Sequence, residues 1–246
     1  MRCERRKEID GVIISKRQLH QRVFLYRVRN CRGGKCYYPK SNRILPRWRW
    51  SACDIGKLVT AEGIYTVTKV KKIAEKIYHY IEGKLPAVNE ECKGELDWEN
   101  RYKLMRTHTA MHLLSGLIWN DYTVQVTGGN MEPLKARMDF EFADFAKELI
   151  AEIEEKADRE IANKRDIRTA VLAREEAFKN PDLIRTKINL LPAGIEQIRT
   201  VEIVGLDLQA DGGTHVQNTS EIGKIRIVDY KSKGKINKRL YVEISD

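Results

Sequence analysis

Two histidines four residues apart are the first feature of this sequence that could carry chemistry. His108 and His112 lie in the segment Arg106–His112, and side chains four apart share one face of a helix. Their imidazoles could therefore hold a single ion, as helical histidine pairs do in zinc enzymes. The same spacing also fits two surface or core histidines with ordinary hydrogen bonds, so a metal site needs further ligands.

A second cluster, Asp211–His215, supplies candidates for those ligands. Its residues are Asp-Gly-Gly-Thr-His, and a glycine pair permits a tight turn that brings Asp211 and His215 to neighbouring sides of a loop. Imidazole and carboxylate groups both bind zinc. Three of the five histidines of the chain lie in these two clusters. We therefore predict a metal site with the ligands His108, His112, Asp211 and His215; the alternative is a β-turn with an incidental histidine.

The pattern does not fit a zinc metalloprotease. That mechanism needs a glutamate directly after the first histidine as general base, and this position is occupied by Thr109. Peptide hydrolysis by that route is disfavoured.

Two segments resemble a known family. His108–Ser115 (His-Thr-Ala-Met-His-Leu-Leu-Ser) and Gly212–Val216 (Gly-Gly-Thr-His-Val) are similar to the two signatures of the alanyl-tRNA synthetase editing domain, and especially of its free-standing relatives, the AlaX-type alanyl-tRNA editing proteins. Thr127–Asn130 and Ala136–Phe140 also match the style of the family. The resemblance covers about residues 95–246, and an added N-terminal β domain is similar to the medium-length AlaX class.

The resemblance implies a trans-editing hydrolase. Its substrate would be tRNA(Ala) carrying a wrong amino acid, chiefly serine, with glycine as a second candidate. One zinc ion would be held by His108, His112 and His215, and the fourth family position, usually cysteine, is Asp211 here. We expect Asp211 to be a weak or exchangeable ligand or a hydrogen-bonding partner of His215. Catalysis would rest on zinc-bound water or on substrate positioning, with Thr109 and Thr214 near the site and no protein general base identified.

Four further residues are candidates for contact with the tRNA acceptor end. Arg106 and Arg137 lie beside the metal candidates in the sequence, and Gly212 and Gly213 permit close approach of the backbone. For the two arginines, salt bridges within the domain are the alternative use.

The pattern of apolar residues predicts an α+β protein with two domains. Residues 1–90 show the short alternating runs of a small antiparallel, barrel-like β domain, with strands at Ile9–Ser15, Val23–Val28, Ile64–Lys71 and Lys76–Glu82. Leu85–Gly94 is a candidate linker. For residues 95–246, which the resemblance identifies as the zinc-binding tRNA editing domain, the pattern predicts an antiparallel sheet with two long helices. We expect those helices at Trp98–Asn120, capped by Asp97, and at Asp144–Lys164, and a turn at Gly128-Gly129. The expected strands are Ala136–Phe142, Ile167–Leu172, Glu196–Val204, Ile222–Tyr230 and Ile236–Ile244.

The N-terminal part departs from the family in one stretch. The family carries a motif like Phe-Tyr-Pro-x-Gly-Gly-Gly-Gln-Pro-x-Asp, whereas this chain has Ile44–Ala52 before Asp54. Tryptophan has the single codon TGG, and with suitable codons Arg43–Ala52 read one base later gives Gly-Phe-Tyr-Pro-Gly-Gly-Gly-Gly-Gln. Our hypothesis is that about residues 26–52 are translated out of frame. The rival interpretation is a basic-aromatic patch, Arg43–Trp50, that binds single-stranded RNA.

The positive charge is concentrated in the same region. The chain has 246 residues and a net charge of +10; residues 1–90 hold 21 Lys+Arg against 8 Asp+Glu, and Arg27–Arg49 has eight basic residues and no acid. Such a stretch fits contact with nucleic-acid phosphates, but also a solvated surface. The expectation of a tRNA partner therefore rests on the histidine signatures rather than on charge.

Composition excludes several other classes. Five cysteines, an odd number without dense spacing, disfavour a disulfide framework, and a metal knuckle at Cys31, Cys36 and Cys53 lacks a fourth ligand. No apolar run approaches the ~20 residues of a membrane span, and no signal peptide opens the chain. We therefore expect a cytoplasmic protein without a membrane partner.

Three functions remain at this stage. The first is the zinc-dependent aminoacyl-tRNA ester hydrolase. The second is a catalytically impaired tRNA-binding module with a structural zinc, and the third is a metal-dependent hydrolase of small esters. No ATP-binding signature is present, so ATP is not expected and a synthetase is disfavoured. Serine versus glycine preference and oligomeric state are not encoded in any recognisable motif.

Overall fold

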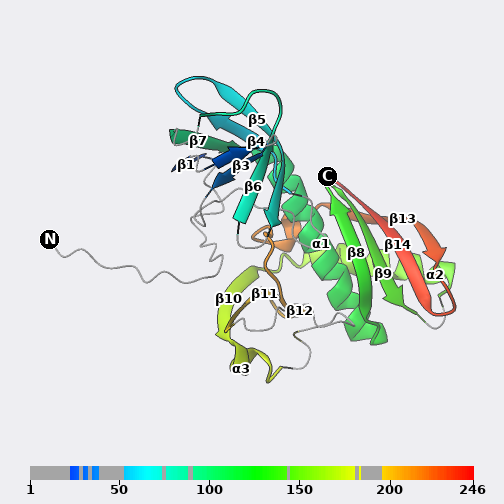
Figure 1. The fold of residues 1–246 in the computed structure, drawn as a ribbon. Helices are drawn as coiled ribbons and strands as arrows, with labels where there is room; N and C mark the ends of the chain where they lie inside the picture. Colours follow the sequence, from blue (N-terminus) through cyan, green and yellow to red (C-terminus); the bar gives the residue numbers. More distant parts are fainter. Residues whose placement is uncertain are drawn as a thin grey trace.

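A computed structural model of the chain describes residues 23–27, 30–32, 35–38, 53–73, 76–87, 91–142, 145–180, 183 and 196–246. Within them the fold is α+β, as predicted, with three antiparallel sheets and two main helices. The helix α1 (Trp98–Tyr122) runs through the middle of the molecule, and the sheets lie around it (Figure 1).

The N-terminal part is a seven-stranded antiparallel sheet. Its strand order is β1-β7-β4-β5-β6-β3-β2, with the bounds Val23–Arg27, Glu91–Leu96, Gly56–Val59, Ile64–Ile73, Lys76–Ile81, Lys35–Tyr38 and Asn30–Arg32. Strands β1 and β2 are the two edges, and no pairing between them closes a barrel among the described residues. Over the described residues the sheet is therefore open and not the barrel that the sequence predicted.

Two details of this sheet differ from the sequence expectations. Part of the expected linker is strand β7, which pairs with β1 and β4. Strand β4 was not expected at all. The expected strand Ile9–Ser15 lies outside the described residues, as does the Arg43–Ala52 segment; of residues 26–52 only parts of three strands are described. The out-of-frame hypothesis and the division into domains stay predictions.

The C-terminal part contains two sheets. The four-stranded sheet has the order β13-β14-β9-β8, with the bounds Lys224–Ser232, Asn237–Ser245, Lys135–Glu141 and Val126–Glu132. The three-stranded sheet has the order β10-β11-β12, with the bounds Ile167–Ala173, Gln197–Ile203 and Asp207–Ala210, and the short helix α3 (Arg174–Ala177) follows β10. The predicted strands are confirmed within a few residues. The predicted turn at Gly128-Gly129 is wrong, because both glycines lie in β8, where the pairing shifts register after Val126.

The two predicted helices are confirmed. The carboxylate of Asp97 caps α1 by accepting from Asn100 N–H at 3.0 Å, and Thr123 ends it in the left-handed conformation at φ 53°. Helix α2 (Lys147–Ala162) turns Ile153 and Ala157 into the core. Most of α1 is buried on all sides, because it packs against α2, β8, β9 and β12. A functional side chain on this helix therefore has a position set by the core.

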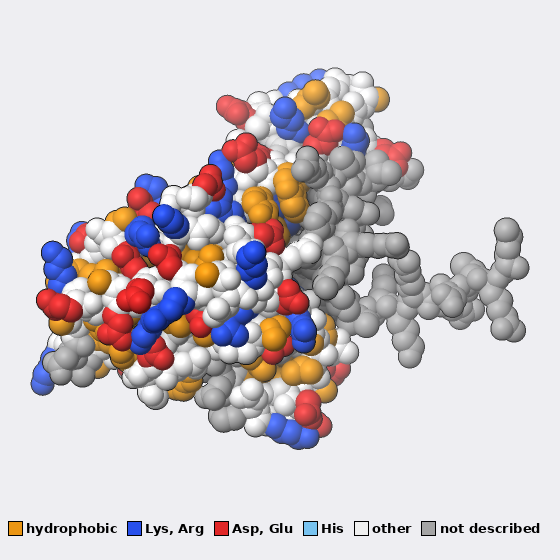
Figure 2. Space-filling view, turned by 180° about the vertical axis from the view of Figure 1, so that it is seen from behind, with side chains coloured by type: hydrophobic (Ala, Val, Ile, Leu, Met, Phe, Trp, Pro, Cys, Tyr) orange, Lys and Arg blue, Asp and Glu red, His pale blue; other side chains and the backbone are white. Residues whose placement is uncertain are grey.

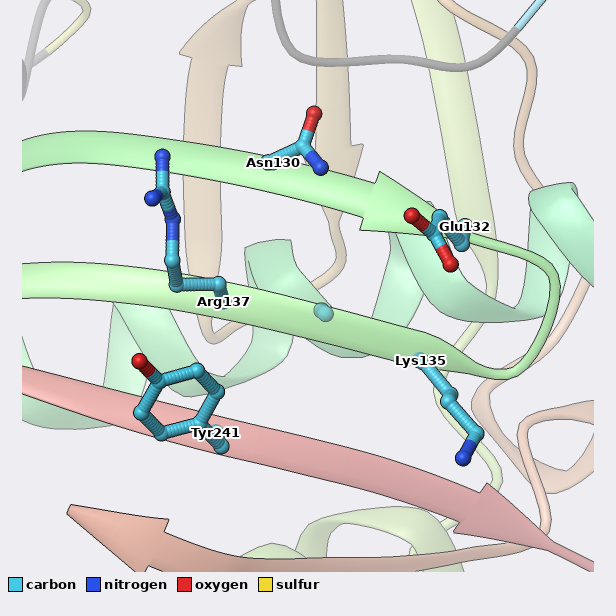
Figure 3. Close-up of a pocket in the computed structure, with 6 residues that line it drawn as sticks. Asn130, Glu132, Lys135, Arg137 and Tyr241 are labelled. Atoms are coloured by element: carbon cyan, nitrogen blue, oxygen red, sulfur yellow. The ribbon is translucent and has the colours of Figure 1, made fainter.

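Mainly polar side chains line a cavity on one face of the four-stranded sheet. Asn130, Arg137 and Tyr241 lie side by side across β8, β9 and β14, and Glu132, Lys135 and Ala136 complete the lining (Figure 3).

On the face of the molecule seen in Figure 2, Lys and Arg side chains are interspersed with Asp and Glu. That face shows no continuous basic surface. No helix among the described residues is long and apolar enough to cross a membrane.

A buried ion pair joins the N-terminal sheet to α1. The guanidinium of Arg101 binds Asp54 through two hydrogen bonds, of which Nε to Oδ1 is 2.7 Å, and both side chains are more than nine-tenths buried. Asp97 N–H donates to Ile55 O at 3.1 Å beside it, and Trp98 packs against both hydrophobic cores. These contacts fix the start of α1 against the N-terminal sheet.

We expect Asp54→Ala to lower the free energy of unfolding by about 3–5 kcal/mol, because it leaves the Arg101 charge buried without its partner. Urea denaturation followed by circular dichroism measures the loss. Lys93→Ala is the matched control, since it removes an exposed ion pair with Glu95 in the same sheet and should leave the midpoint nearly unchanged. Equal midpoints for the two variants would contradict the assigned role of Asp54.

Candidate metal centre

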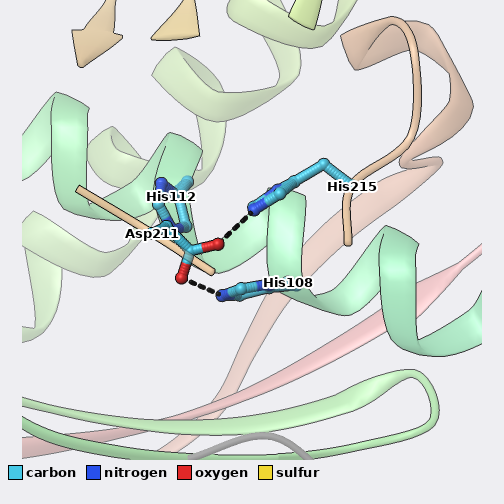
Figure 4. A group of neighbouring side chains, drawn as sticks. All are labelled: His108, His112, Asp211 and His215. Carbon is cyan, nitrogen blue, oxygen red and sulfur yellow. Dashed lines mark hydrogen bonds and ion pairs between the residues drawn. The ribbon is translucent and has the colours of Figure 1, made fainter. Parts of the chain in front are cut away.

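The structure brings the four predicted ligands together. The candidate ligand atoms of His108, His112, Asp211 and His215 all lie within 4.8 Å of one another (Figure 4). His108 and His112 come from consecutive turns of α1, and the other two come from the loop after β12. The rings of His108 and His215 stack at 4.2 Å, and His112 lies edge-on to both. The four-residue spacing of the histidines and the turn at the Gly-Gly pair thus bring the ligands together, as predicted from the sequence.

The two carboxylate oxygens of Asp211 have different partners. Oδ2 accepts from Gly213 N–H at 2.6 Å and lies 3.1 Å from His215 Nε2, whereas Oδ1 faces His108 Nε2 at 3.6 Å. The guanidinium of Arg199 in β11 donates to the backbone oxygen of Asp211 at 2.8 Å, with Nη1 3.7 Å from Oδ2. Arg199 was missed by the sequence analysis, because nothing in its neighbourhood marks it. It adds a positive charge beside the carboxylate.

The Thr109 hydroxyl contacts the outer nitrogen of His215, Nδ1. The Thr109 hydroxyl donates to Met105 O at 2.9 Å and accepts from Val216 N–H at 3.2 Å. Its single proton is therefore used, and toward His215 Nδ1, 3.2 Å away, it acts as an acceptor. A cation on Nε2 requires the tautomer of His215 that is protonated on Nδ1, and the Thr109 hydroxyl is placed to accept that proton.

This orientation tests whether a cation fits. His215 Nε2 lies 3.1 Å from Asp211 Oδ2; protonated, it donates to this carboxylate, and deprotonated, its lone pair is stabilised there by a cation that takes the place of the proton. Three imidazoles and one carboxylate are also the nitrogen and oxygen donors that zinc binds. The residues therefore fit a cation, which the three histidines and Asp211 would hold.

The electrostatics of the cluster favour the same state. Burial lowers the pKa of His108 to about 4, and burial with the neighbouring His108 lowers the pKa of His215 well below its ordinary value. Burial would raise the pKa of Asp211, but the surrounding histidines hold it well below its ordinary value. Two neutral imidazoles and an ionised carboxylate are the forms that bind metal.

Gly213 has a steric role in the cluster. A Cβ atom on Gly213 would lie 2.3 Å from His108 Cε1 and 2.6 Å from Nδ1, so only glycine permits the loop to approach this imidazole. Gly212 beside it is exposed, and Thr214 is buried. The glycine pair thus serves the histidine site directly.

The two arginines proposed for RNA contact lie apart from the four ligands. Arg106 donates to Ile222 O and Ser245 O, both at 3.0 Å, and to Asp246 Oδ1 at 2.7 Å, which ties α1 to the C-terminal strand. Arg137 lines the cavity on the four-stranded sheet, and its Nε is buried without a hydrogen bond (Figure 3). Contact of either with RNA stays a prediction.

Asp207 and Gln209 are functional candidates that the sequence analysis missed. Asp207 Oδ2 lies 3.4 Å from His112 Nδ1, and Gln209 Nε2 donates to both oxygens of Asp207 at 2.9 and 3.1 Å. Burial lowers the pKa of His112, but hydrogen bonding to Asp207 and the charges of Asp211 and Asp207 raise it above its ordinary value overall. The only sequence signal for Asp207 is that it is an acidic residue four positions before Asp211.

Comparison with known proteins identifies the family. The description "Threonyl and Alanyl tRNA synthetase second additional domain" matches residues 198–241, which include the loop of Asp211 and His215. The chain thus contains a domain type shared with two aminoacyl-tRNA synthetases. It is 34% identical over 199 residues to the alanyl-tRNA editing protein AlaX-M of Methanosarcina barkeri, covering 78% of this chain and 82% of the relative. It is 37% identical over 195 residues to AlaX-M of Saccharolobus solfataricus, with 78% and 81% covered.

A longer relative matches over a small part of its length. The alanine–tRNA ligase of Ignicoccus hospitalis is 34% identical over 190 residues, which cover 74% of this chain and 20% of the ligase. By these matches the chain belongs to the AlaX-M family of alanyl-tRNA editing proteins. The family resemblance drawn from His108–Ser115 and Gly212–Val216 is confirmed.

We expect Gly213→Ala to weaken Zn²⁺ binding on the order of tenfold or more, because the added Cβ displaces the His108 imidazole. Competition with a chromophoric chelator measures the dissociation constant. Gly128→Ala is the control, since its Cβ would meet only the Asp139 carboxylate, at 3.2 Å, away from the four ligands. An unchanged constant for Gly213→Ala would show that the loop does not press on His108.

We expect the affinity for Zn²⁺ to rise with pH through the pKa of His112 and then to level off. Because that pKa is raised, His112 keeps a proton at lower pH, and a cation must displace it from Nε2. His108 and His215, with lowered pKa values, are already neutral there. Calorimetry in two buffers of different ionisation enthalpy measures the proton released. Affinity that does not change between about pH 6 and 9 would contradict this assignment.

Proposed function

We propose that this protein hydrolyses the ester bond of mischarged tRNA(Ala), chiefly seryl-tRNA(Ala), with glycyl-tRNA(Ala) as a second substrate, at one Zn²⁺ ion. The observation that carries the proposal is the convergence of three imidazoles and one carboxylate in a chain of the AlaX-M family. We place the activity in the cytoplasm, where tRNA is aminoacylated and a free-standing editing protein meets its substrate.

The exposure of the ligands indicates where a substrate arrives. The side chains of His108 and Asp211 keep 15% and 13% of their surface exposed, whereas that of His215 keeps 2%. The side chain of His112 keeps 10%, so His215 is the innermost ligand and His108 and Asp211 are the most exposed ones. A tRNA 3′ end would approach from the side of His108 and Asp211.

The chain's own groups bind and orient in this reaction. A bound Zn²⁺ ion supplies Lewis acidity toward an ester carbonyl or a water. The three histidines and Asp211 hold that ion, Thr109 fixes the ring of His215, and Gly213 lets the loop close on His108. Water adds to the ester carbon, the bond to the ribose oxygen breaks, and the amino acid and tRNA leave. Because an aminoacyl ester is already activated, positioning can supply much of the rate.

Asp211 is the residue in which this chain departs from the cysteine usual at this family position. We propose that it binds the cation through Oδ1, since Oδ2 is engaged by Gly213 N–H at 2.6 Å. Arg199 beside it offsets part of its negative charge. Such a ligand is weaker than a thiolate, which leaves the ion more open to exchange with substrate or water.

We expect the purified protein to deacylate seryl-tRNA(Ala) and expect His108→Ala and His112→Ala to abolish this turnover, because each removes a ligand of the cation. Asp211→Cys should keep activity and Asp211→Ala should reduce it. Release of labelled serine from the tRNA, measured beside the metal content of each variant, tests these outcomes.

The control variant is Lys156→Ala, which removes ion pairs with Asp121 and Glu152 on the surface of α2 and should leave turnover unchanged. Binding of tRNA without turnover in the wild-type protein would support the binding module instead. Turnover of small aminoacyl esters at the same rate as of aminoacyl-tRNA would support the small-ester hydrolase.

A further inference from the structure

A buried carboxylate lies behind the metal centre, on the outer side of His112. Asp207, the first residue of β12, has a side chain without solvent exposure, and its Oδ2 lies 3.4 Å from His112 Nδ1. His112 Nδ1 is itself buried and makes no hydrogen bond of normal geometry, so its contact with Asp207 at 3.4 Å is that of an ion pair. The acid therefore faces the nitrogen of His112 that points away from the other three ligands.

The surroundings of Asp207 hold this carboxylate in place. Gln209 donates to both of its oxygens through Nε2, which also lies 3.3 Å from Ser115 Oγ on α1. On the other side, Gly116 of α1 leaves the space that Asp207 fills, because a Cβ there would lie 2.9 Å from Asp207 Cβ. Burying a carboxylate costs free energy unless it is hydrogen-bonded, so this arrangement is maintained by specific contacts.

The other two histidines have different surroundings at Nδ1. His215 Nδ1 meets the neutral hydroxyl of Thr109, and His108 Nδ1 lies against Gly213. Among the described contacts of the three rings, a carboxylate at Nδ1 is found only at His112. A carboxylate that accepts the outer N–H of a ligating imidazole fixes its tautomer and strengthens its metal-facing nitrogen.

We propose that Asp207 is a positioning residue that keeps the His112 proton on Nδ1, directs the Nε2 lone pair into the cluster, and so makes His112 the strongest cation ligand of the three histidines. Gln209 and Gly116 support it by fixing the carboxylate. The inference rests on the proposed cation binding at this site and adds a residue to it.

The test measures Zn²⁺ affinity and the state of the imidazole, without recourse to catalytic activity. We expect Asp207→Ala to raise the Zn²⁺ dissociation constant about 10–100-fold. Asp207→Asn should raise it less, because its amide oxygen still accepts from Nδ1–H but carries no charge. In long-range ¹H–¹⁵N spectra, His112 should be protonated on Nδ1 in the wild-type protein and should lose this preference in Asp207→Ala. The absorption bands of the Co²⁺-loaded protein should shift in both variants.

The matched control is Asp139→Asn. Asp139 is also a buried aspartate, with 12% of its side chain exposed; it accepts from Nε and Nη2 of Arg239 at 2.7 Å each and lies in β9 rather than at the metal centre. This variant should lose stability but keep the wild-type Zn²⁺ affinity. If Asp207→Ala does not fold, Asp207→Asn against Asp139→Asn still decides the question.

The outcomes separate the two proposals. Wild-type protein that does not bind Zn²⁺ overturns the metal centre itself, and with it the proposed function. Wild-type protein that binds Zn²⁺, with the same affinity and the same His112 tautomer in both Asp207 variants, overturns the role of Asp207 alone.

Discussion

The burial of three imidazoles around one ionised carboxylate is the constraint on which the rest of this structure depends. In the interior, an ionised carboxylate is costly unless it is paired, and Asp211 lies 3.1 Å from His215 Nε2 and 3.6 Å from His108 Nε2. A cation bound at this point interacts favourably with the carboxylate and the imidazole nitrogens, which offsets that cost. Helix α1 meets the requirement by being buried on nearly all sides, so that His108 and His112 have little freedom. The loop of Asp211 can lie close to His108 because Gly213 has no Cβ atom, which would collide with the imidazole.

The support for the cluster comes from the neighbouring layers of the fold. Thr109 links α1 to the chain at Val216 and contacts the outer nitrogen of His215, and Asp207 of β12 contacts the outer nitrogen of His112. At the other end of α1, Arg101 and Asp54 join the helix to the N-terminal sheet. A single helix therefore carries the ligands and connects the two cores. This arrangement suits a site in which placement of the substrate supplies much of the rate.

Several elements were predictable because their signals are local. The Asp97 cap and the apolar spacing defined α1, and the alternating segments defined most strands of the C-terminal part. The signatures around His108 and Gly213 indicated the family, which the comparisons confirm. Strand β7 was missed, since Glu91–Leu96 has a mixed composition and becomes a strand by pairing with β1 and β4. The Gly128-Gly129 pair was misassigned because glycines serve a bulge in a strand as well as a turn.

The sequence by itself determined which residue types could bind a cation, the helical spacing that places two of them on one face, and the family to which the chain belongs. The tertiary structure decided how those residues are used. It showed that Asp211 turns one oxygen to Gly213, that Arg106 ties α1 to the C-terminal strand, and that Asp207 lies behind His112. The physical reason is that helix spacing is a property of adjacent residues, whereas a hydrogen bond between α1 and β12 depends on how sheets and helix pack, which no local pattern encodes.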